Sequence, residues 1–221
     1  MNKELAEIVK LYATSSHKSL RATVLEKSKD NIIAILMDLL TLYFNDKNSS
    51  TLRQFLLVTL SGYEMNAEKI GYNGYRQMSI GAPMSYCEAK PKNVNTNDKR
   101  PKKLDGGGNF TDYTWARLKK DLKANPIMLA GGFIDGKLIY ICEFPFKTKS
   151  FTNRLTEQLK RHLPNGYESG RFLRSASFGL KNYKDCPKLK TQVFVNKKEL
   201  DDLKKSLTKQ LFDFLYNKAP K

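Results

Sequence analysis

The stretch that decides the fold is Tyr72–Asn93, which reads Tyr-Asn-Gly-Tyr-Arg-Gln-Met-Ser-Ile-Gly-Ala-Pro-Met-Ser-Tyr-Cys-Glu-Ala-Lys-Pro-Lys-Asn. Its centre, Tyr86–Lys90, has the alternation of a strand. Side chains two residues apart on a strand share a face, so Glu88 and Lys90 are predicted to lie side by side. Asn73-Gly74 lies fifteen residues upstream of Glu88, where a second strand could begin.

A carboxylate beside an ammonium group is suited to chemistry on phosphate. Glu88 offers oxygen to a hard divalent cation such as Mg²⁺. Lys90 would stand beside an attacking water and stabilise the negative charge that develops. Glu-x-Lys alone is a weak signal, because charged pairs at this spacing are common on solvated strand faces. The following Pro91-Lys92-Asn93 and the basic chain favour the catalytic interpretation.

Asn73-Gly74 followed by Glu88-Ala89-Lys90 resembles the PD-(D/E)xK nuclease superfamily, in which an acid near one strand start precedes (Asp/Glu)-x-Lys on the next strand. The resemblance covers about residues 64–145. It implies an α/β fold with a mixed central β-sheet flanked by helices, a restriction-endonuclease-like core. Within the superfamily, a compact basic chain of this length looks most like a type II restriction endonuclease.

Such an enzyme cleaves double-stranded DNA at specific sequences with Mg²⁺, so the resemblance assigns catalysis to Glu88 and Lys90. Asn73 takes the position of the family's acid, and metal binding is assigned to Glu88 and Asn73. A homodimer is expected, because symmetric DNA sites match twofold proteins. Two alternatives stay open: a structure-directed repair or recombination nuclease, and a catalytically silent DNA-binding protein.

Asn73 departs from the family, which normally has Asp there. An amide keeps one carbonyl oxygen but loses the charge that attracts a metal. Either Glu64 or, second, Glu68 supplies the missing carboxylate, or the protein is a weakened or inactivated form. Asn-Gly is also a hairpin-turn signal in its own right.

The composition favours a polyanionic partner. The 221 residues include 39 Lys+Arg against 22 Asp+Glu, which gives a net charge of +17 and a pI near 9.7. Such a charge promotes DNA binding through counterion release. No long apolar stretch or signal peptide is present, so no membrane partner and a cytoplasmic location are expected. Three cysteines without a Cys-x-x-Cys pair and two histidines suggest neither disulfides nor zinc.

DNA contacts are predicted in two regions. Residues after the Glu-x-Lys pair and in the basic loop over 94–109 are expected to meet phosphates, with the alternative of a solvated loop. They are Lys92, Asn93, Lys99, Arg100, Lys102 and Lys103. A strand predicted over 170–178 carries Arg171, Arg174 and Ser175, and arginine can pair with guanine in the major groove.

The chain is interpreted as a single nuclease domain over 1–221. Residues 1–62 form an N-terminal helical part, 63–145 the catalytic core, and 146–221 a C-terminal α/β part with DNA readout. Helices are predicted over 2–12, 20–44, 51–60, up to 122, 151–163 and 197–216, and strands within 64–90 and over 127–132, 137–144, 170–178 and 191–195. We place His17 in a loop and Thr51 at a helix cap. The apolar stripe over 32–43 is placed in the core, with a dimer interface as the alternative.

Overall fold

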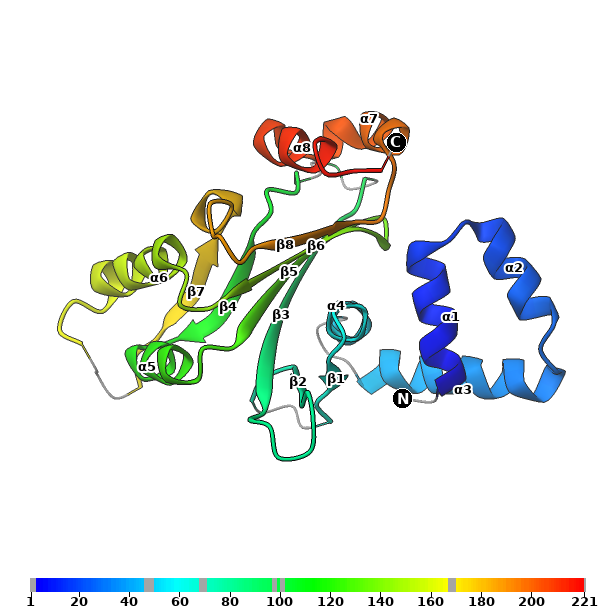
Figure 1. The fold of residues 1–221 in the computed structure, drawn as a ribbon, viewed down its shortest axis with the longest axis horizontal. Helices are drawn as coiled ribbons and strands as arrows, with labels where there is room; N and C mark the ends of the chain where they lie inside the picture. The colour runs from blue at the N-terminus through cyan, green and yellow to red at the C-terminus, as the bar shows by residue number, and fades with distance from the viewer. Residues whose placement is uncertain are drawn as a thin grey trace.

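The computed structural model describes residues 3–45, 50–67, 71–96, 99, 102–166 and 170–220. Within these ranges, six strands form a mixed sheet, two more form a separate ribbon, and helices flank both (Figure 1). This architecture confirms the predicted α/β class with a mixed central sheet. None of the helices in these ranges is both long and apolar enough to cross a membrane.

The elements have the following bounds. The strands are β1 (Glu64–Met65), β2 (Gly74–Arg76), β3 (Ser85–Val94), β4 (Gly108–Tyr113), β5 (Ile127–Ile134), β6 (Lys137–Pro145), β7 (Leu173–Phe178) and β8 (Lys190–Val193). The helices are α1 (Lys3–Thr14), α2 (His17–Leu25), α3 (Lys29–Asn45), α4 (Thr51–Leu60), α5 (Trp115–Ala124), α6 (Lys149–His162), α7 (Lys197–Leu203) and α8 (Lys209–Tyr216). Short 3₁₀ turns lie at η1 (Leu180–Asn182) and η2 (Lys204–Ser206).

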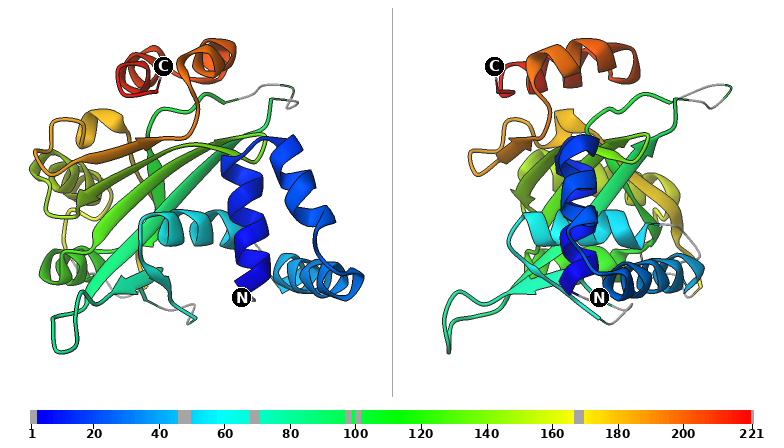
Figure 2. Two further views of the ribbon diagram at one scale, coloured as in Figure 1. Left: turned by 45° about the vertical axis from the view of Figure 1, so that its right-hand side comes forward. Right: turned by 90° about the vertical axis from the view of Figure 1, so that its right-hand side faces the viewer.

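Helices α1, α2 and α3 form a group beside the sheet (Figure 2). The prediction of a single helix over 20–44 is wrong, because the helix is interrupted between the end of α2 and the start of α3. There Ser28 Oγ accepts a hydrogen bond from the Asn31 N–H at 3.3 Å. A serine that bonds the backbone in this way favours a helix start over continuation.

The loop predicted around His17 is also wrong. Ser16 Oγ accepts a hydrogen bond from the Ser19 N–H at 3.2 Å, which caps α2. His17 is therefore the first residue of α2, and its ring stacks on Tyr12 with centroids 5.9 Å apart. Thr51 begins α4, but the cap position before it is Ser50, which makes no side-chain cap bond.

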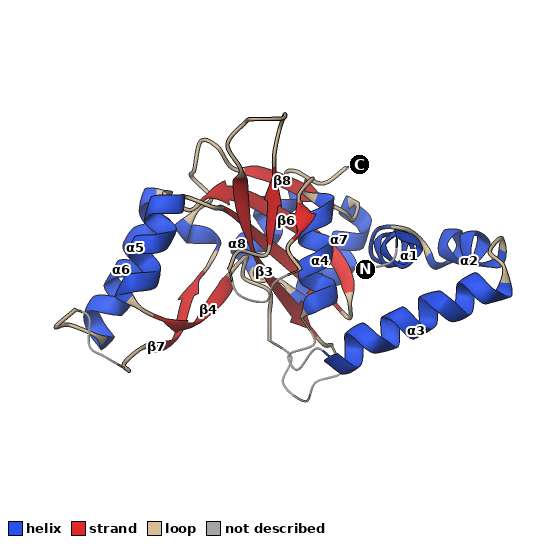
Figure 3. Cartoon of the chain, turned by 90° about the horizontal axis from the view of Figure 1, so that it is seen from below, coloured by secondary structure: helices blue, strands red, loops and turns tan. Residues whose placement is uncertain are grey.

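The apolar stripe of α3 is largely solvent-exposed, so its placement in the core is wrong. Ile35 is buried, whereas Ile33, Leu36 and Met37 are 56%, 52% and 62% exposed. The physical reason is that α3 contacts α1, and its N-terminal part extends beyond the sheet together with α2 (Figure 3). The part of the stripe over 40–43 lies outside the side chains that the structure describes.

The main sheet has the order β1-β2-β3-β5-β6-β8. Only the β3–β5 pair is parallel; the other neighbours in this sheet are antiparallel. A parallel pair needs a long crossover, and β4 and α5 supply it. The hairpin predicted at Asp135-Gly136 is confirmed: both residues have positive φ and join β5 to β6.

Asn73-Gly74 is not a hairpin turn. Gly74 is the first residue of β2 and pairs with Cys87 of β3. A Cβ at this position would lie 2.6 Å from Val58 Cγ1 and 2.7 Å from the Glu64 carbonyl oxygen. Glycine is therefore required for the close approach of α4 to the sheet, and this packing overrides the local turn signal.

Alternation along the strands divides the core between the two faces of the sheet. Met128 and Ala130 of β5 belong to the core beneath α5, α6 and the ribbon, while Leu129 belongs to the core beneath α4. Glu88 and Lys90 stand opposite Met128 and Ala130 in the β3–β5 register. Both therefore point to the face that carries α5 and the β4–β7 ribbon.

The ribbon pairs β4 antiparallel to β7, two strands far apart in sequence. The sequence predicts a polar, basic loop over 94–109, but within it Leu104 is fully buried and bridges to Leu207. Leu207 also separates α7 from α8, where one helix over 197–216 was predicted. The contact between these two leucines holds the loop against the C-terminal helices. The helix predicted over 197–216 is interrupted at Leu207 because burying this side chain stabilises the fold more than another helical turn would.

Candidate active site

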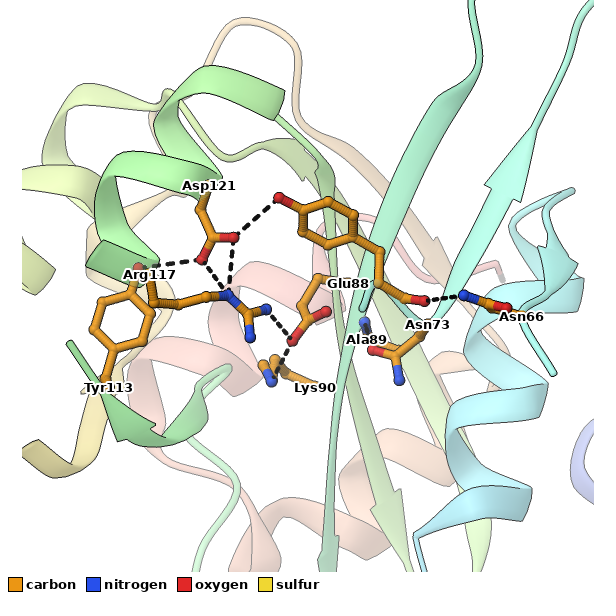
Figure 4. Close-up of polar contacts among 9 residues, drawn as sticks. Asn66, Asn73, Glu88, Ala89, Lys90, Tyr113, Arg117 and Asp121 are labelled. Atoms are coloured by element: carbon orange, nitrogen blue, oxygen red, sulfur yellow. Dashed lines mark hydrogen bonds and ion pairs between the residues drawn. The ribbon is translucent and has the colours of Figure 1, made fainter. Parts of the chain in front are cut away.

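Glu88 and Lys90 lie side by side on β3, as the sequence predicts. Lys90 Nζ lies 2.8 Å from Glu88 Oε1 (Figure 4). The Glu88 side chain is 8% exposed and that of Lys90 17%, so the pair is shielded from water but not closed off. Lys90 Nζ also lies 4.4 Å from the centre of the Phe110 ring in β4. A cation above an aromatic face is held there electrostatically.

A second charged pair, on α5, adjoins the first. Arg117 and Asp121 are four residues apart, and Arg117 Nε donates to both Asp121 carboxylate oxygens at 3.0 Å. Arg117 Nη2 lies 3.4 Å from Glu88 Oε1 (Figure 4). Arg117 therefore bridges two carboxylates, and the four charges sum to zero.

Two tyrosine hydroxyls complete the surroundings of Asp121. Tyr72 donates to Asp121 Oδ1 at 3.0 Å, and Tyr113 to Oδ2 at 3.4 Å. Asp121 is 1% exposed, and this burial raises the pKa of its carboxyl, although Arg117 and Tyr72 act in the opposite direction. Burial and then Asp121 raise the pKa of both tyrosines, which stay protonated donors.

Arg117 keeps its charge despite partial burial. Burial alone would lower the pKa of Arg117, but Glu88 and Asp121 together raise it. These helix residues were not predicted from the sequence. The available signal was an aspartate on the buried side of an amphipathic helix, with an arginine one turn earlier, because a buried carboxylate needs a partner.

One oxygen of this cluster, Glu88 Oε2, has no hydrogen-bond partner among the residues that the structure describes. Glu88 Oε2 is buried and unpaired, while Oε1 meets both cations. Mg²⁺ is usually bound through one or two carboxylates together with phosphate and water oxygens. Glu88 Oε2 therefore fits one ligand of such an ion. Within the described ranges no three His, Cys, Asp or Glu side chains gather to hold a metal.

Asn73 lies beside Glu88, one residue beyond the last β2–β3 pair, Gly74 opposite Cys87. Its Oδ1 accepts a hydrogen bond from the Ala89 N–H at 2.8 Å (Figure 4). The amide oxygen of Asn73 thus extends the ladder in place of a backbone group. Asn73 therefore lies next to the strand segment that carries Glu88, and its role as a metal ligand stays a prediction.

The upstream acids are placed differently. Glu64 on β1 pairs with Tyr75 of β2, and β2 separates it from β3. Two strand spacings amount to roughly 10 Å. A hydrogen bond from Tyr75 to Glu64, with the charge of Glu64, raises the pKa of Tyr75. The Glu64 carboxylate therefore interacts with Tyr75 rather than with Glu88. Glu68 lies outside the described residues.

Two of the predicted DNA contacts are engaged within the protein. Lys92 Nζ lies 2.9 Å from Asp105 Oδ1, and Asn93 Oδ1 accepts from the Gly136 N–H at 3.1 Å. Asn93 thereby holds the β5–β6 hairpin. Its side chain performs a structural task that the sequence did not indicate.

The other predicted DNA contacts lie at the surface. Lys99, Lys102, Lys103, Arg171, Arg174 and Ser175 are all exposed. Arg174 and Ser175 belong to β7, and Arg171 precedes that strand. Arg100 lies outside the described residues. The structure brings none of these exposed residues into the Glu88 cluster itself.

Comparison of the chain with protein-family models, curated proteins and solved structures finds no match.

Proposed function

We propose that this protein is a Mg²⁺-dependent, sequence-specific endonuclease of double-stranded DNA, with the architecture of a type II restriction enzyme. The observation that carries the proposal is the Glu88–Lys90 pair, 2.8 Å apart on one strand face, with residue 73 beside Glu88. Support comes from the antiparallel β2–β3 pair followed by α5 and by β5 parallel to β3. That order is compatible with the core that the superfamily resemblance implies.

The side chains divide the work of phosphodiester hydrolysis. Lys90 holds a phosphate oxygen and stabilises its growing negative charge, as preorganised donors do in water-excluded sites. Arg117 holds Glu88 and Asp121 in place and keeps the buried cluster neutral before DNA binds. Mg²⁺ held by Glu88 would supply a Lewis acid and a water of lowered pKa. An acid at position 73 would complete that ligand set.

Asn73 limits the activity of the present chain. A hard cation is held chiefly by anionic oxygens, and an amide oxygen is a weaker ligand. Aspartate has the same size as asparagine and would retain an acceptor for the Ala89 N–H while adding charge. We therefore expect the chain to bind DNA and to cleave it slowly, and Asn73→Asp to accelerate cleavage.

A silent DNA-binding protein is the second candidate. It is favoured by the balanced charges of the cluster, where Lys90 and Arg117 both neutralise Glu88 without a metal. The net charge of +17 favours DNA binding under either candidate.

Plasmid DNA incubated with and without Mg²⁺ separates the candidates. Discrete bands support the restriction-type enzyme, and nicking only at branched or damaged DNA supports a structure-directed repair nuclease. A mobility shift without cleavage, by both the wild type and Asn73→Asp, supports the silent binder.

We also propose that α3 forms a homodimer face. Its exposed residues Ile33, Leu36 and Met37 make an apolar surface of a kind that marks interaction sites. The whole helix contains one lysine and two aspartates, although the chain carries +17. A second copy can approach there with little like-charge repulsion, whereas DNA would gain nothing from so uncharged a surface.

A further inference from the structure

The outer face of the β4–β7 ribbon carries exposed polar side chains, and the charged residues Asp112 and Arg174 are also exposed on these two strands. Asn109 pairs with Ser177, and Thr111 pairs with Ser175. Asn109, Thr111 and Ser175 are exposed, whereas the alternate residue Phe110 is buried. The ribbon therefore has one apolar face in the core and one polar face in solvent.

This ribbon begins at the candidate active site. A Cβ at Gly108 would lie 2.7 Å from Lys90 Cβ, so the first residue of β4 lies against that lysine. The next residue but one, Phe110, carries Lys90 Nζ above its ring. Thr111 is three residues further than Gly108, which is about 10 Å along a strand. That length corresponds to about three base steps of duplex DNA.

The chemistry of this face suits bases better than phosphates. Phosphates are held mainly by charged donors, and removing neutral side chains changes the salt dependence of binding little. The major groove admits a two-stranded ribbon, asparagine pairs bidentately with adenine, and serine or threonine can meet any base. Arg174, also exposed on β7, can hold the neighbouring backbone.

We propose that the outer face of the β4–β7 ribbon reads base edges in the major groove, with Asn109 selecting adenine and Thr111 and Ser175 contacting adjacent bases. The inference rests on the proposed function, because it takes double-stranded DNA as the ligand. It adds Asn109 and Thr111 as specificity-determining residues, which lie within about 10 Å along β4 of Gly108, the residue packed against Lys90.

The test selects preferred sites from random duplex DNA with the full-length chain, in Ca²⁺ so that binding is measured without cleavage. Asn109→Ala should weaken binding to the wild-type site by roughly 5- to 150-fold and relax one adenine position. Asn109→Asp should shift that position towards cytosine, whose amino group a carboxylate accepts. Thr111→Ala should relax a neighbouring position.

Asn217→Ala is the matched control, because Asn217 is exposed at the end of α8. It should leave the selected site unchanged, and the salt slope should stay the same in the three variants to alanine, which change no charge. A wild type that binds every duplex equally, or none, refutes the proposed function itself. A wild type with a clear site that Asn109→Ala, Asn109→Asp and Thr111→Ala all still select overturns this inference alone.

Discussion

Replacing Arg117 by methionine should destabilise the protein by leaving a buried carboxylate without its cation. Asp121 is 1% exposed and receives two hydrogen bonds of 3.0 Å from Arg117 Nε. Removing one partner of a buried ion pair costs about 3–5 kcal/mol. We expect about 3 kcal/mol, the lower end, because the Arg117 side chain is 34% exposed and the two tyrosine bonds to Asp121 remain.

The loss should depend on pH in a definite direction. Burial raises the pKa of Asp121 in the folded state, whereas Arg117 lowers it. A carboxyl group whose pKa is higher in the folded state than in the unfolded state destabilises the folded state when it ionises. Its contribution to stability is therefore lost as pH rises from the unfolded pKa, about 3.9, through the folded pKa. Without Arg117 the folded pKa rises further. The difference in stability between Arg117→Met and the wild type should therefore grow as pH rises from about 4 to neutrality.

Urea unfolding followed by circular dichroism across this pH range measures both quantities. Asp121→Asn is the control, because a neutral amide does not need the guanidinium group as a partner. The double variant Arg117→Met with Asp121→Asn should therefore be more stable than Arg117→Met alone at neutral pH. Equal pH profiles for Arg117→Met and the wild type, with no recovery in the double variant, would refute the buried ion pair.

Three further changes test the remaining claims. In the Asn73→Asp background, Glu88→Ala and Lys90→Ala should each lower Mg²⁺-dependent plasmid cleavage by ~10²-fold or more while DNA binding persists, and cleavage near that of Asn73→Asp alone by either would remove these residues from the site. Neutralising the four cations within 99–103 should flatten the salt dependence of DNA binding by about 0.9 for each lost phosphate contact, measured by fluorescence anisotropy; an unchanged slope would mean that the loop makes no such contacts. Ile33→Glu with Leu36→Glu should convert a dimer to a monomer in light scattering, whereas a monomeric wild type would contradict the dimer and leave this face to another protein.

Local patterns predicted much of the fold because alternation and turn residues decide strands such as β3, β5 and β6. They failed where distant packing decides the outcome. Gly74 is a strand residue because Val58 and the Glu64 carbonyl approach it closely. Neither residue is a near neighbour of Gly74 in the sequence, so no local pattern shows this contact. Likewise Leu104 is buried against the C-terminal helices, about one hundred residues later.

The candidate site was predictable only on one strand. Glu88 and Lys90 follow from a spacing of two on β3. Arg117 and Asp121 come from α5, and their approach depends on the crossover that makes β5 parallel to β3. No local pattern states which helix face meets which strand. The sequence therefore predicted half of the charged cluster.

Cleavage of plasmid DNA with Mg²⁺, by the wild type, Asn73→Asp and Glu64→Gln side by side, tests whether residue 73 is the missing metal ligand. We expect slow or undetectable cleavage by the wild type and a rise of ~10²-fold or more in Asn73→Asp, because a carboxylate beside Glu88 completes the metal ligands. Full-speed cleavage by the wild type, unchanged by Asn73→Asp and abolished by Glu64→Gln, would contradict it. No cleavage by any of the three would favour the silent DNA-binding protein.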